Sequence, residues 1–161
     1  MNVVLNLVSM NIPTEFDDIR PFEPEELPAV FERLASNAQF NQMLGYVMPG
    51  VPVEMIHQKM LQCKTNMDFQ LAFCYSFLKN LMAKASKGCD IDVQAIDINS
   101  RYTFVSNHRD IVLDSALLDV LLVDAGCKTT CEIAIGDNLL SLPWVKDLVR
   151  VNKSFIVKRG L

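Results

Sequence analysis

The sequence lacks the long apolar run that a membrane span requires. Half of its 161 residues are apolar, but polar side chains interrupt apolar stretches such as residues 69–78, which include Gln70, Tyr75 and Ser76. A transmembrane helix needs ~20 consecutive, mostly apolar residues. The first ten residues are apolar but have neither the basic leading segment nor the small-residue cleavage site of a secretion signal. We therefore expect a cytoplasmic protein.

An excess of positive charge is also missing. The chain has 15 Lys and Arg residues against 19 Asp and Glu residues, a net charge of -4 and an isoelectric point near 5.1. Proteins that bind nucleic acid generally present a basic surface to the phosphates. Nucleic acid is therefore not an expected partner.

Cysteine and histidine are too few and too irregularly spaced for a disulfide framework or a zinc site. The five cysteines are an odd number, which favours reduced thiols. Cys127 and Cys131 lie four positions apart, but without a second pair of ligands they suit packing better than zinc. His57 has Gln58 and Lys59 as neighbours, typical of a surface histidine. We expect no metal and no bound cofactor.

The pattern of apolar residues divides the chain into two regions within one structural unit, because 161 residues suit a single core. Residues 1–88 contain an acidic, proline-rich entry and then apolar residues at helical spacing, and Asn66 is a plausible cap for the last helix of this region. Residues 89–161 alternate strand-like runs with helices. The helices are expected at residues 27–34, 40–47, 53–63, 66–87, 114–124 and 139–149, and the strands at 91–98, 102–106, 131–135 and 154–157. The predicted fold class is α/β, with amino-terminal helices followed by an incomplete mixed sheet and flanking helices.

The most informative motif is Asn107-His108-Arg109-Asp110, followed by Asp114. It lies between the expected strand 102–106 and a helix, and open α/β folds keep their chemistry at the carboxyl ends of strands. A histidine held by a carboxylate can act as a general base near neutral pH. Asp114 could instead only cap the helix that follows it. We favour a catalytic role for His108, with acyl or phosphoryl transfer to an alcohol as the candidate reactions.

His108-Arg109-Asp110 also matches the start of the protein-kinase catalytic loop. A kinase needs an asparagine five residues after the aspartate, where this chain has Ser115. It also needs a glycine-rich loop and an Asp-Phe-Gly triplet, and both are absent from the sequence. The kinase interpretation is therefore rejected.

A second candidate cluster follows the expected strand 154–157, where Lys158 and Arg159 form a basic end. Two cations at the carboxyl edge of a strand suit a phosphate or a carboxylate, and arginine offers two parallel donors; the plain alternative is a solvated end. The turn Gly136-Asp137-Asn138 has two interpretations as well. It either caps the next helix or lines the same rim as His108.

Residues 102–114 resemble the first conserved block of glycerolipid acyltransferases of the lysophosphatidic acid (1-acylglycerol-3-phosphate) acyltransferase type. Residues 133–159 are similar to the second block, in particular Ile135-Gly136-Asp137-Asn138-Leu139-Leu140 and the run from Asn152 to Arg159. The entry segment Phe16-Asp17-Asp18-Ile19-Arg20-Pro21 resembles a bacterial subgroup of this family. The resemblance covers most of the chain.

The resemblance implies transfer of an acyl group from acyl-CoA or acyl-carrier protein to the hydroxyl of lysophosphatidic acid or a related glycerol phosphate, in phospholipid synthesis. It implies that His108 is the base and that an aspartate orients its ring. Asn107 would shape the loop and, with Arg109, would bind substrate, and Arg159, with Lys158 beside it, would hold the acceptor's phosphate. The enzyme would act as a peripheral protein at the inner face of the membrane.

The chain departs from the family pattern in two ways. The family spacing His-x4-Asp falls on Leu113, whereas the aspartates are Asp110 and Asp114; both stay candidates, and we favour Asp114. The family's third block, a Pro-Glu-Gly run and an arginine, is expected after Arg159 but is not in the sequence. We therefore expect an amino-terminal portion of the enzyme, inactive or weakly active alone, with an open edge on its last strand and a tendency to self-associate. The alternative is a non-catalytic module that binds acyl chains or a partner protein.

Overall fold

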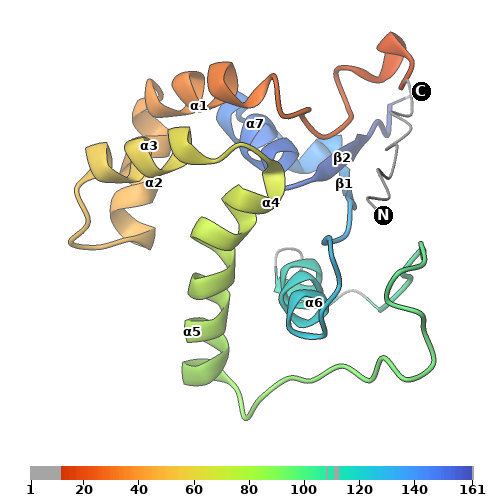
Figure 1. Cartoon of the computed structure of the whole chain (residues 1–161). Coiled ribbons are helices and arrows are strands. Elements are labelled where there is room, and N and C mark those ends of the chain that lie inside the picture. The colour runs from red at the N-terminus through yellow and green to blue at the C-terminus, as the bar shows by residue number, and fades with distance from the viewer. Residues whose placement is uncertain (1–11, 108, 111–112, 161) are drawn as a thin grey trace, which may run out of the picture.

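The computed structural model describes residues 12–107, 109–110 and 113–160 (Figure 1). It is 52% helical and contains a small parallel sheet of two strands, so the α/β class is confirmed at that coarse level. No helix in these ranges is long and apolar enough to cross a membrane. The helices are η1 (Thr14–Phe16), α1 (Leu27–Ala35), α2 (Ala38–Val47), α3 (Val53–Gln62), α4 (Asn66–Phe69), η2 (Gln70–Tyr75), α5 (Ser76–Ala85), α6 (Leu113–Asp124), η3 (Asp137–Leu139) and α7 (Pro143–Val151), and the strands are β1 (Ile133–Gly136) and β2 (Ser154–Val157).

The main core lies among the first helices and α7. One face of α1 is fully buried, with Leu27, Val30, Phe31 and Leu34 at the i, i+3, i+4, i+7 spacing of an amphipathic helix. These side chains share one cluster with buried residues of α2, α3, α4 and α7. Burial of a large apolar side chain contributes roughly 1.5–3 kcal/mol to folding. Because the helical conformation places all four of these side chains on one face that can be buried, their spacing predicts the helix at residues 27–34.

A long helical segment, residues 66–85, consists of α4, the π-helical turn η2 and α5. Its amino-terminal cap is Thr65, which corrects our assignment of that role to Asn66. The Thr65 hydroxyl accepts the N–H of Asp68 at 3.1 Å, and the Asp68 carboxylate accepts the N–H of Thr65 at 2.9 Å, which is a capping box. Asn66 instead donates from its side-chain amide to the carbonyl oxygen of Val151 at 2.8 Å.

The two strands are parallel, and the segment between them contains α7. Ile133 is in register with Ser154, and Gly136 is in register with Val157. The strands that we predicted at 131–135 and 154–157 therefore form, each within two residues of the expected bounds. Because the strands are parallel, their carboxyl ends lie at the same edge of the sheet.

The strands predicted at residues 91–98 and 102–106 do not form. Among the described residues, only β1 and β2 are strands, and the region 87–107 runs as a loop from the lower end of α5 to the right of α6 in Figure 1. Val105 is 91% exposed, and Tyr102 and Phe104 are exposed as well. Aromatic and β-branched residues favour a strand only where a neighbouring strand and a buried face are present, and this segment has neither among the residues described.

The entry segment packs against the outer edge of β2. Ile156 donates its backbone N–H to the carbonyl oxygen of Ile19 at 2.8 Å. Arg150 of α7 is buried and donates to the carbonyl oxygens of Arg20 at 2.7 Å and Asp17 at 2.5 Å. The edge of the last strand, which we expected to be open, is therefore covered at Ile156.

Candidate functional site

The carboxyl edge of the sheet brings together Asp137, Asn138 and Arg159. The backbone N–H of Arg159 lies 3.3 Å from both carboxylate oxygens of Asp137. A Cβ atom at Gly136 would lie 2.9 Å from Nε of Arg159 and 2.6 Å from Oδ1 of Asn138. Glycine at position 136 therefore allows the guanidinium of Arg159 to lie directly against the end of β1.

Lys158 faces the entry segment instead. Its Nζ atom lies 2.7 Å from Oδ2 of Asp18, and both side chains are about half exposed. The hydrogen bond from Lys158 lowers the pKa of Asp18. The two basic residues predicted to share an anion site thus have different neighbours, an acidic side chain for Lys158 and the end of β1 for Arg159.

The loop before α6 is held by its own carboxylates. Oδ2 of Asp114 accepts the backbone N–H groups of Arg109 at 2.6 Å and Asp110 at 2.9 Å. Oδ1 of Asp110 accepts the N–H of Leu113 at 2.8 Å. Because α6 begins at Leu113, Asp114 lies inside its first turn and bonds backwards to the loop. This differs from the alternative in which Asp114 only caps the helix that follows it.

His108, the predicted base, lies outside the described residues, and its pairing with Asp110 or Asp114 stays a prediction. Asn107 and Arg109 are exposed. The structure groups Asn107, Arg109, Asp110 and Asp114 at the start of α6, while Lys158 and Arg159 lie at the end of β2, far from α6 in Figure 1. The two groups are separate because the 102–106 segment, expected to carry the loop into the sheet, is not a strand.

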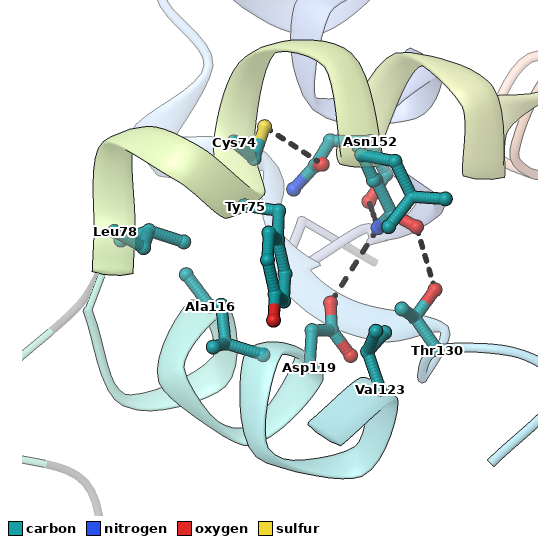
Figure 2. A pocket seen from close by; sticks show the side chains of 11 residues that line it. Cys74, Tyr75, Leu78, Ala116, Asp119, Val123, Thr130 and Asn152 are labelled. Carbon is teal, nitrogen blue, oxygen red and sulfur yellow. Dashed lines mark hydrogen bonds between the residues drawn. The ribbon is translucent and has the colours of Figure 1, made fainter. Parts of the chain in front are cut away.

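A buried polar cluster lies between α6 and the helical segment 66–85. Asp119, Gln70 and Thr130 are each at most 7% exposed. Oδ1 of Asp119 accepts the backbone N–H of Cys131 at 2.8 Å, and Oδ2 lies 3.5 Å from Nε2 of Gln70. The Thr130 hydroxyl donates to Oε1 of Gln70 at 2.6 Å. Figure 2 shows Asp119 directed from α6 toward this cluster.

Burial controls the proton equilibria in this region. Loss of hydration raises the pKa of Asp119 to about 6, although the N–H of Cys131 and the charge of Lys153 oppose the rise. The same effect raises the thiol pKa of Cys74 and of Cys131 to about 11. It also lowers the pKa of the half-buried Lys153. Each shift disfavours the charged form, as expected for groups removed from water.

The cavity beside the cluster is small. It is lined by Leu71, Tyr75, Val120 and other residues of η2, α5 and α6, and its volume is about 20 Å³. That is room for about one water molecule, so the cavity does not fit an acyl chain.

Comparisons of this chain with protein-family models, with curated proteins and with solved structures find no match.

Among the described residues, no group of three or more His, Cys, Asp or Glu side chains could hold a metal ion. The five cysteines are all free thiols. His57 makes a 2.9 Å hydrogen bond between Nε2 and Oδ1 of Asn41, which gives it a structural partner.

The buried cluster around Asp119 was missed at the level of the sequence. One signal was present, because Asp119 is the only charged residue in the run from Ala116 to Val123. A carboxylate on an otherwise apolar helix is rarely buried unless it has hydrogen-bond partners. Its partner Gln70 gave no such signal, since a glutamine in a helix is usually exposed.

Proposed function

We propose that the chain belongs to a glycerolipid acyltransferase that transfers an acyl group from acyl-CoA or acyl-carrier protein to the hydroxyl of lysophosphatidic acid or a related glycerol phosphate. The observation that carries the proposal is the position of Arg159, with its guanidinium against Gly136 at the carboxyl edge of two parallel strands. Such an edge is where open α/β sheets bind ligands. Residues 102–114 and 133–159 resemble the family's first two blocks, and this resemblance is the reason for assigning Arg159 to the phosphate of the acceptor.

Arg159 is suited to a phosphate by its chemistry. A guanidinium stays charged at every physiological pH and can donate two parallel hydrogen bonds to phosphate oxygens. Asp137 accepts the main-chain N–H of Arg159, which fixes the backbone at the residue that would hold the acceptor. Asn138 lies at the same edge, close to Gly136, and an amide can bond a glycerol hydroxyl or a phosphate.

The reaction proposed is an acyl transfer with His108 as general base. It requires the start of α6 and the carboxyl edge of the sheet to come together around one acceptor, because they lie apart in this structure. The acceptor hydroxyl oxygen attacks the thioester carbonyl carbon while His108 takes the hydroxyl proton. The tetrahedral intermediate then collapses, the C–S bond breaks and the new C–O ester bond remains. The proton passes from His108 to the leaving thiolate, so the base is restored.

The carboxylates before and within α6 have a supporting role in this proposal. Asp114 accepts two N–H groups of the loop that follows His108, so it fixes that loop as it leaves the histidine. One of Asp110 and Asp114 would also orient the imidazole and favour the imidazolium that forms. Contact with lipid substrates would occur at a membrane surface.

The experiment that tests this role of Arg159 compares two acceptors, lysophosphatidic acid and the uncharged monoacylglycerol, in an acyl-CoA assay. Arg159→Gln is expected to lower kcat/KM for lysophosphatidic acid by about 10–100-fold, the loss of a charged hydrogen bond of roughly 1.5–3 kcal/mol, and to leave monoacylglycerol transfer unchanged. Equal losses for both acceptors would remove Arg159 from phosphate recognition. Binding of acyl-CoA without any product would instead favour a non-catalytic acyl-binding module.

A further inference from the structure

Asp119 is a buried carboxylate that the proposed reaction does not use. It lies in the middle of α6 and is 7% exposed. Its hydrogen bonds reach two other parts of the chain, the backbone of Cys131 just before β1 and the side chain of Gln70 in η2. The contact of α6 with the rest of the structure therefore includes a group that can gain or lose a proton.

The groups around Asp119 compensate its charge poorly. The cation whose charge acts on Asp119 is Lys153, but its ammonium donates to the Thr129 hydroxyl and the Thr130 carbonyl oxygen, both at 2.7 Å. The other titratable groups coupled to these side chains are Glu132 and the thiols of Cys74, Cys127 and Cys131. None of these is cationic, so apart from the charge of Lys153 the ionised carboxylate depends on the 2.8 Å bond from Cys131 and the long 3.5 Å contact with Gln70.

The partner of Asp119 is in an unusual part of its helix. Gln70 is the first residue of the π-helical turn η2, and its amide also lies 3.4 Å from the carbonyl oxygen of Asn152. Single π-helical turns within longer helices are frequent at functional sites. Gln70 thus connects α6 through Asp119 with the turn between α7 and β2.

We propose that Asp119 is a proton-sensitive latch, which holds α6 tightly against the helical segment 66–85 and the residues before β1 when the carboxyl is neutral and less tightly when it is ionised. The neutral form can still accept the N–H of Cys131 and removes an isolated negative charge from the protein interior. Ionisation restores that charge, and the cost is smallest when α6 moves outward and water reaches the carboxylate.

The latch also bears on the loop that carries the proposed base, because Asp114 in the first turn of the same helix holds that loop. This consequence rests on the proposed acyltransferase function, whereas the latch does not. The experiment below measures folding stability and makes no use of catalysis, so failure of one idea is distinguishable from failure of the other.

The test is urea unfolding at pH 5.0 and pH 7.5 for the wild type, Asp119→Asn and Asp124→Asn. Asp124 is a matched control on the same helix, since it pairs with Lys79 at 2.7 Å and with Tyr75, and its pKa is lowered, so it stays ionised across this range. The pKa of Asp119 is higher in the folded state than in the unfolded state. The free energy of unfolding therefore falls as the pH rises from the unfolded-state pKa through the folded-state pKa. The unfolding constant of the wild type is expected to rise about ten-fold from Asp119 alone.

Two outcomes separate the latch from a structural role. The proposal expects Asp119→Asn to lose this ten-fold component while Asp124→Asn keeps it; the same pH dependence in all three proteins would overturn it. If Asp119→Asn does not fold, the carboxyl carbon of Asp119 in the wild type is titrated by NMR. A midpoint near 6 supports the latch, and a midpoint at or below 4 overturns it.

Discussion

Ile156, in the middle of β2, donates its backbone N–H to the carbonyl oxygen of Ile19. The N···O distance of this bond is 2.8 Å, and it joins the entry segment to the outer edge of a strand 137 positions later in the sequence. Lys158 continues the same contact through Asp18. The entry segment thus packs beside the strand that leads to the proposed phosphate-binding residue.

The anchor of this segment is Arg150, and its removal is expected to be costly. Its guanidinium lies 3.9 Å from the ring centre of Phe22 and bonds two carbonyl oxygens, from a position that is 6% exposed. Arg150→Ala would remove a buried guanidinium together with its two bonds to the entry segment and its contact with Phe22, at about 2–4 kcal/mol of unfolding free energy. Urea unfolding measures this loss.

Arg33→Ala is the matched control. Arg33 pairs with Asp147 through two 3.1 Å bonds, but its side chain is 54% exposed, and surface pairs are worth about 0–1 kcal/mol. Equal losses in the two variants would contradict the anchoring role of Arg150.

Glycine 136 should be sensitive to a single added methyl group. In Gly136→Ala, the new Cβ atom would meet Nε of Arg159 at 2.9 Å, so the guanidinium must move. We expect lysophosphatidic acid binding to weaken by about ten-fold, the equivalent of ~1.4 kcal/mol, as measured by calorimetry. Gly160→Ala, where nothing lies within 4 Å, should bind normally; equal affinities of both variants would argue against a role for the Arg159 position.

The capping box at Thr65 should stabilise the helical segment 66–85. Thr65→Ala removes the hydroxyl that accepts the N–H of Asp68, and we expect a loss of about 1 kcal/mol in thermal or urea unfolding. Thr65→Ser keeps the hydroxyl and should retain most of that stability. A loss as large in the serine variant as in the alanine variant would point to the methyl group and not to the cap.

The cysteines should differ in reactivity toward iodoacetamide at pH 8. Cys89 is exposed, whereas burial raises the pKa of Cys74 and Cys131 to about 11, so almost none of their thiolate is present. Since the thiolate is the reactive form, mass spectrometry should find Cys89 alkylated first and these two last. Alkylation of Cys131 as fast as Cys89 would mean that its surroundings are open to solvent.

The helices and strands that could be predicted are those that a pattern of apolar residues within the same segment determines. The i, i+3, i+4, i+7 spacing of Leu27, Val30, Phe31 and Leu34 identifies α1 because one helix face must be buried. The apolar runs at 133–135 and 154–157 identify β1 and β2. In these cases the sequence near each residue contains the reason for its conformation.

The predictions that were wrong concern segments whose conformation depends on residues distant in the sequence. Tyr102, Phe104 and Val105 have strand propensity, but a strand also needs an adjacent edge to bond. The prediction of the candidate site depended on the same distant contact. The 107–110 loop and Arg159 would lie close together only if the predicted strand 102–106 joined the sheet. The cluster of Asp119 with Gln70 and Thr130 joins residues 49 and 60 positions apart, which no local pattern reveals.

The central claim is that His108 draws a proton from an acceptor hydroxyl during acyl transfer, and the most direct measurement is product formation from labelled acyl-CoA and lysophosphatidic acid by the wild type and by His108→Ala. The account predicts labelled diacylated product from the wild type and a rate at least ~100-fold lower in the variant, the usual contribution of a general base. Equal rates of product formation in the two proteins would contradict it.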